Sequence, residues 1–89
     1  MYLVQSWVNG DGLDSWSFED RSVAEGVFKA KVEARARDMW KENRQATVKL
    51  DDSEVWAYSL CEEDDYGNQS EDLEYESLSW KKAKERLGR

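Results

Sequence analysis

Six apolar residues recur at helical spacing in the middle of this chain of 89 residues. At about 100° per residue they fall within about a third of a turn, so they form one continuous stripe made of Ala24, Phe28, Val32, Ala36, Met39 and Trp40. The stretch opens with Ser22-Val23-Ala24-Glu25, which has the form of a capping box. We therefore expect a helix from Ser22 to about Asn43, with its stripe against a sheet. Arg35, at the edge of the stripe, should reach outward or pair with an acid from elsewhere in the fold.

Strand-forming residues precede and follow this helix. Tyr2 to Val8 is rich in β-branched and aromatic residues, and the turn residues 9–12 after it predict a hairpin with a short strand around Trp16 and Phe18. Beyond the helix, residues 47–51 and 54–61 indicate a second hairpin, which we expect at the centre of the sheet.

The C-terminal part predicts an edge strand and a second helix. Leu73 and Tyr75 stand at strand spacing among glutamates, which indicates an acid-lined edge strand. Trp80, Ala83 and Leu87 then recur at helical spacing among lysines and arginines. A chain of this length has room for one core. Residues 1–89 therefore predict a single α+β domain, in which a small antiparallel sheet packs on one long helix, with a short basic C-terminal helix.

An acidic block interrupts the pattern of strands and helices. Eight acidic residues and no Lys or Arg lie between Glu62 and Glu76, in a chain whose net charge is −7. Charge this concentrated repels itself and attracts cationic surfaces. We expect the block to contact a protein partner that has a basic groove. Acids of the second predicted hairpin turn (Asp51, Asp52 and Glu54) or of the first loop (Asp11 and Asp14) should reinforce it. The predicted partner-binding residues are Glu62, Glu63, Asp64, Asp65, Tyr66, Glu71, Asp72, Glu74, Tyr75, Glu76, Asp51 and Asp52.

Two other interpretations of the block stay open. The basic C-terminal helix, together with Arg35 or Arg37, could neutralise the acidic block at close range. The block would then stabilise the fold or act as a solubilising loop. Alternatively, a non-enzymatic adaptor or scaffold module could bind its partner through exposed aromatics such as Trp16 or Trp80, with the acids serving solubility.

The residue types argue against catalysis and against a dedicated metal site. The chain has no His and one cysteine, Cys61, so no Ser/His or Cys/His pair can form, and we expect neither an enzyme nor a cofactor. If Gly67 took the glycine position of a calcium-binding EF-hand loop, Tyr66 and Leu73 would stand where ligands are required. Cys61 is expected to be a small packed residue rather than a nucleophile.

Charge and hydropathy also bear on location and partners. The net charge of −7 opposes direct binding to nucleic acid. No window approaches the ~20 apolar residues of a membrane span. The first residues lack a cationic start and a secretory apolar region. We expect a cytoplasmic monomer or weak dimer, in the host cell cytoplasm if it is phage-encoded.

In size, in its single α+β domain, in its lack of catalytic residues and in its clustered acids, the chain resembles small acidic inhibitors made by phages. These include anti-CRISPR proteins and other nucleic-acid mimics. The resemblance is one of kind and includes no specific residue pattern. It implies a stoichiometric blocker of a nucleic-acid-handling complex.

Overall fold

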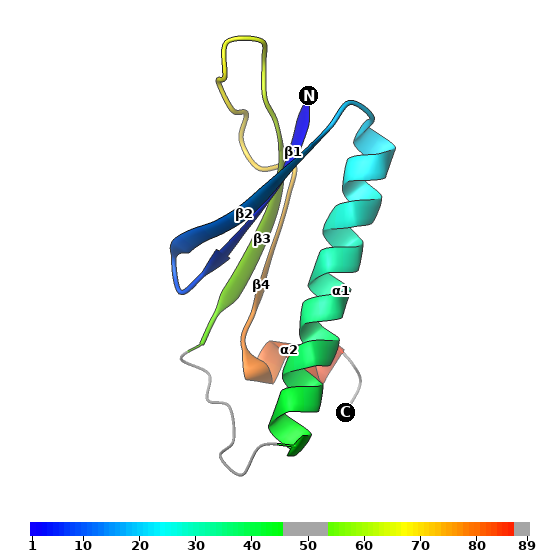
Figure 1. Ribbon diagram of the computed structural model, residues 1–89, viewed down its shortest axis with the longest axis vertical. Coiled ribbons are helices and arrows are strands. Elements are labelled where there is room, and N and C mark those ends of the chain that lie inside the picture. The colour runs from blue at the N-terminus through cyan, green and yellow to red at the C-terminus, as the bar shows by residue number, and fades with distance from the viewer. Residues whose placement is uncertain (46–53, 87–89) are drawn as a thin grey trace.

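The computed structural model describes residues 1–45 and 54–86. An antiparallel four-stranded sheet, with the strand order β2-β1-β3-β4, lies against one long helix, and a short helix follows the last strand (Figure 1). The fold is therefore α+β, as the sequence predicts. The elements are β1 (Tyr2–Val8), β2 (Asp11–Phe18), α1 (Arg21–Gln45), β3 (Trp56–Glu62), β4 (Glu74–Leu78) and α2 (Trp80–Arg86).

The first hairpin forms as predicted, with a tighter turn than residues 9–12. Asn9 and Gly10 alone make the turn, and both have positive φ, 51° and 85°, as a two-residue hairpin turn requires. Asp11 and Gly12 already belong to β2. Ser6 pairs with Asp14 but the next residue, Trp7, pairs with Gly12, so Leu13 is an extra residue in β2. This is a β-bulge, which locally bends a strand.

The start of α1 differs from the predicted capping box. The helix begins at Arg21, and Asp20 caps it: its Oδ1 accepts hydrogen bonds from the Ser22 backbone N–H and from the Ser22 hydroxyl, both at 2.8 Å. Glu25 instead pairs with Arg21 at 3.0 Å. A carboxylate is the stronger acceptor at this position, so Asp20 takes the role expected of Ser22. Hydrogen bonds from the Ser22 hydroxyl and from the backbone N–H groups of Ser22 and Val23 hold the pKa of Asp20 below its ordinary value.

The core lies between α1 and one face of the sheet. The predicted stripe is confirmed, because Ala24, Phe28, Val32, Ala36 and Met39 are buried and Trp40 is half-buried. They pack against Val4, Tyr58, Leu60 and Leu78 of the sheet and Ala83 of α2. Each large apolar side chain buried here contributes about 1.5–3 kcal/mol relative to exposure.

β3 and β4 carry the chain from the centre of the sheet to its edge. β3 lies between β1 and β4, and β4 is the predicted acid-lined edge strand. The predicted strand at residues 47–51 lies outside the described residues, as do Leu87 and Gly88 of the predicted second helix. Within the described ranges, neither helix is long and apolar enough to cross a membrane.

Candidate protein-binding site

Residues 63–73, which we call the acidic loop, join β3 to β4 and extend beyond the sheet (Figure 1). The two arms of the loop are hydrogen-bonded to each other. Ser70 donates from its backbone N–H to the Glu62 carbonyl at 2.8 Å, and its hydroxyl accepts from the Glu62 N–H at 2.9 Å. Glu63 and Gln69 form an isolated antiparallel bridge. The block is thus folded back on itself, so acids far apart in the sequence stand on adjacent arms.

Asp64 organises the far end of the loop. Its carboxylate accepts hydrogen bonds from the backbone N–H groups of Tyr66 and Asn68, each at 2.9 Å, and its carbonyl accepts from the Gly67 N–H at 3.1 Å. Gly67 has a φ of 84°, which favours glycine. The hydrogen bond from the backbone N–H of Asn68 contributes most to lowering the pKa of the Asp64 carboxyl. Asp64 therefore acts as a turn residue, a role that sequence reasoning missed.

Tyr66 lies at the tip of this turn and is 90 % exposed. An aromatic side chain with few neighbours of its own offers a large contact area to a partner at low conformational cost. Asp64 and Asp65 precede it directly, and both are exposed. The tip thus combines an aromatic ring with negative charge.

Most carboxylates of the block have no cation of their own within the described part of the chain. Of the eight, Glu76 alone is in an ion pair there, with its Oε1 at 3.7 Å from Nη1 of Arg86. The Nε of that arginine lies closer, at 3.0 Å, to Oε2 of Glu33 on α1. One guanidinium is therefore shared between two acids, and it does not reach the loop.

The order of the elements along the chain places the basic helix α2 away from the acidic loop. α2 follows β4 directly, whereas the acidic loop precedes it, so the two lie at opposite ends of β4 (Figure 1). A strand of five residues spans roughly 17 Å at about 3.3 Å per residue. Arg35, the other proposed source of neutralising charge, stacks on the Trp56 ring at 3.8 Å from its centroid. Arg37 is exposed and in no ion pair with a described residue.

The acids expected to reinforce the block do not gather beside it. Asp11 pairs with Val8, which pairs in turn with Trp56 at the start of β3, and Glu54 also precedes that strand. Both acids therefore lie at the end of β3 opposite the loop. Asp51 and Asp52 lie outside the described residues. Of the predicted partner-binding surface, the structure therefore brings together the acidic loop and the strand ends that flank it.

The two remaining acids on β4 face the helix side of the sheet. Glu74 pairs with Leu60 and Glu76 with Tyr58, on the face that α1 covers. Both are half-buried, and Oε2 of Glu74 is buried without a hydrogen-bond partner among the described residues. Tyr75, between them, points to the opposite face and is 57 % exposed. The predicted site residues thus divide between an exposed loop and an edge strand that is partly buried.

The sheet face turned away from α1 carries an apolar groove that the sequence did not indicate. It has a volume of about 380 Å³, and its walls include Trp7, Val55, Ala57 and Tyr75. Trp16 and Trp80, the aromatics of the adaptor interpretation, are half-buried and in contact with other side chains. Lys31 lies over the Trp16 ring at 4.2 Å from its centroid, and Trp80 stacks on Trp40 with centroids 5.5 Å apart.

Cys61 lies on this second face of the sheet and is buried. Burial raises the pKa of its thiol, and the nearby charges of Asp72 and Glu63 raise it further. Cys61 is 1 % exposed, so the packed position predicted for it is confirmed.

Within residues 1–42 and 54–86, no three Cys, Asp or Glu side chains converge as a metal-binding group. Comparison with family models, with curated proteins and with solved structures found no match.

Proposed function

We propose that this protein is a small acidic binding protein that inhibits its partner by occluding a basic, nucleic-acid-binding groove. The acidic loop and the adjoining ends of β3 and β4 are the contact. The observation that carries the proposal is the separation of the loop from the basic side chains of α2: this helix lies at the other end of β4, and the described ion pairs of its Arg86 are with Glu33 and Glu76. The N-terminal ammonium reaches the loop, but it donates to the Glu63 backbone carbonyl and forms no ion pair with a described carboxylate.

The fold-back of the loop supports mimicry of a phosphate backbone. If residues 62–76 were fully extended, eight carboxylates would be spread over about 50 Å, which is too dilute to resemble a nucleic-acid strand. In the folded structure, Glu62 at the end of β3 and Glu63 at the start of the loop stand on the arm beside the one that leads to Glu71 and Asp72. Adjacent arms of a hairpin are about 5 Å apart, so the density of negative charge along the loop roughly doubles.

The mechanism is electrostatic attraction followed by docking of the tip. Unpaired surface carboxylates attract a Lys/Arg groove over a Debye length and raise the association rate. Tyr66 then stacks on an arginine side chain inside the groove. Because hydrogen bonds from Tyr66 and Asn68 to Asp64 already order the tip, little conformational entropy is lost on binding.

The test is displacement of nucleic acid from a panel of purified nucleic-acid-binding proteins, including CRISPR effector complexes. We expect the protein to compete at one or more of these grooves, with the logarithm of its affinity falling linearly as the logarithm of salt concentration rises. A loop-neutralised variant should lose about a hundredfold in affinity. That variant carries Glu62→Gln, Glu63→Gln, Glu71→Gln and Asp72→Asn.

A matched control removes the same amount of charge from exposed sites outside the loop: Asp11→Asn, Glu19→Gln, Glu42→Gln and Glu85→Gln. It should bind its partner within about threefold of the unmodified protein, since screening by salt weakens distant charges. If both variants weaken binding equally, total charge and not the loop is responsible, and the proposed contact is wrong.

The apolar groove favours a second candidate function, that of an adaptor that docks a partner on the uncovered face of the sheet. Trp7 and Tyr75 would be its anchors, in place of Trp16 and Trp80. Binding there would change little with salt, and it would be lost in Tyr75→Ser. Because Asp72 is also a wall residue of the groove, the variant that should keep this binding carries Glu62→Gln, Glu63→Gln and Glu71→Gln only. The salt series therefore separates the two functions.

A further inference from the structure

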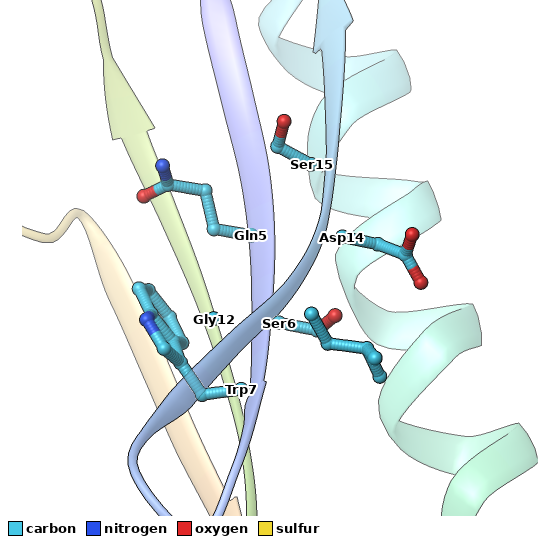
Figure 2. Close-up of a pocket in the computed structure, with 7 residues that line it drawn as sticks. Gln5, Ser6, Trp7, Gly12, Asp14 and Ser15 are labelled. Carbon is cyan, nitrogen blue, oxygen red and sulfur yellow. The ribbon is translucent and has the colours of Figure 1, made fainter.

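Between α1 and the β1–β2 hairpin lies a cleft of about 240 Å³ that is separate from the acidic loop. Its charged walls come from both layers of the fold: Asp14 from β2, and Lys31, Arg35 and Asp38 from successive turns of α1. Figure 2 shows Ser6 and Asp14 pointing toward the α1 side, while Gln5 and Trp7 point to the other face of the sheet. The bulge at Leu13 lies beside this cleft, and bulges often occur next to functional sites.

Two polar groups of the cleft are buried without a partner. Ser6 is 2 % exposed, and its hydroxyl makes no hydrogen bond to any described residue. The Nε of Arg35 is likewise buried and unpaired. A buried N–H without an acceptor is costly, and native proteins almost always supply one. Ser6 and Arg35 both line the same cleft, so its floor is where an acceptor for either group would have to bind.

The four charges of the cleft select the kind of ligand. The two cations lie on tryptophan faces, Lys31 on Trp16 and Arg35 on Trp56, and neither forms an ion pair with Asp14, Asp38 or any other described acid. Two positive and two negative side chains at one site disfavour a simple anion, and a phosphate dianion more strongly, because the carboxylates repel it. They disfavour a simple cation for the converse reason.

The geometry points to a binding site for a small zwitterion, a molecule with one carboxylate and one ammonium group, such as a free amino acid. Its carboxylate would accept hydrogen bonds from Arg35 Nε and the Ser6 hydroxyl. Its ammonium group would lie against Asp14 and Asp38 at the open side of the cleft, where both are exposed. The walls formed by Trp16 and Trp56 would contact the carbon chain between the two groups.

NMR titration of the ¹⁵N-labelled protein tests this site. The probes are glycine, β-alanine and γ-aminobutyrate, whose charged groups are progressively farther apart, with acetate and methylammonium as single-charge controls. We expect at least one zwitterion to shift the Arg35 Nε–H and Trp56 indole N–H signals saturably. Acetate and methylammonium, at the same concentrations, should leave them in place.

Two variants and one control complete the test. Arg35→Gln should abolish the saturable shift, whereas Arg21→Gln, which loses a cation from the first turn of α1, should keep it. Ser6→Ala removes an unpartnered hydroxyl with almost no change of shape, so the fold should persist while the dissociation constant rises about fivefold. The site is refuted if no zwitterion gives a saturable shift, if acetate alone reproduces it, or if Ser6→Ala and Arg35→Gln both bind unchanged.

Discussion

Where α1 covers the sheet, side chains are ordered by burial, whereas the acidic loop is ordered by hydrogen bonds among exposed groups. Leu60 on β3 and Val32 on α1 are almost completely buried, and both belong to the core between the sheet and the helix. Asp64 and Ser70, by contrast, are exposed and hold the loop through backbone amides. The stability of the core should therefore depend on side-chain volume, whereas the order of the loop should depend on its hydrogen-bond acceptors.

Truncation of the core should have the largest effect on stability. Leu60 is fully buried on β3, so Leu60→Ala should lower the free energy of unfolding by about 2–5 kcal/mol. Urea unfolding followed by tryptophan fluorescence measures this loss. Leu73→Ala, which removes the same side chain from a partly exposed position in the loop, is the matched control and should cost much less. Equal losses would mean that the loop contributes to the core.

Removal of the turn acceptor should disorder the loop and leave the core intact. In Asp64→Ala, the amide protons of Tyr66 and Asn68 lose their shared acceptor, so they should exchange at rates close to those of an unstructured peptide. Hydrogen exchange read by NMR gives these rates residue by residue. Asp65→Ala, one position along and equally exposed, should leave them unchanged. Slow exchange in Asp64→Ala would show that the loop is held by something else.

The same turn should respond to acid. The folded-state pKa of Asp64 is lowered by hydrogen bonds to its charged form, so its stabilising contribution is complete above the ordinary aspartate pKa. That contribution is lost as the pH falls through the lowered pKa, when protonation removes the acceptor. A ¹³C titration of the Asp64 carboxyl should therefore have its midpoint below the ordinary aspartate range. A midpoint at or above that range would contradict the turn geometry.

Loss of the shared arginine should have a smaller effect. Arg86→Gln removes the ion pairs with Glu33 and Glu76, both of them partly exposed, so we expect a loss of stability of at most about 1 kcal/mol. The loss should shrink in high salt, because the ion pairs are screened. Lys84→Gln removes an exposed cation from the same helix and serves as the control. A salt-independent loss would indicate packing of the arginine stem instead.

The tip residue should have the smallest effect on folding. Tyr66 is 90 % exposed, so Tyr66→Ala should change the free energy of unfolding by less than about 0.5 kcal/mol. The same variant should weaken partner binding, because the ring is proposed to enter the groove. A variant that lost stability but not binding would reverse the roles assigned to the two regions.

Much of the fold could be predicted because its signals are local. The stripe from Ala24 to Trp40 and the strand at residues 2–8 follow from periodicity, and both are confirmed. The helix cap was misassigned by two residues because Asp20 and Ser22 are both good N-cap residues, and their competition is decided by geometry. A turn at residues 66–70 follows from their residue types, but the hydrogen bond that closes the acidic loop between Ser70 and Glu62 does not, since it depends on how β3 and β4 pair.

Residue spacing along the chain is enough to predict the α+β class, the long helix, the acid-lined edge strand and the concentration of charge between Glu62 and Glu76. It does not predict that α2 lies at the opposite end of β4 from the acidic loop, or that Ser6, Asp14 and Arg35 line one cleft. Local and long-range features differ in how many residues set them. Periodicity and capping act over a few neighbouring residues, whereas the distance between two charged groups depends on strand order and register, which the whole core sets together.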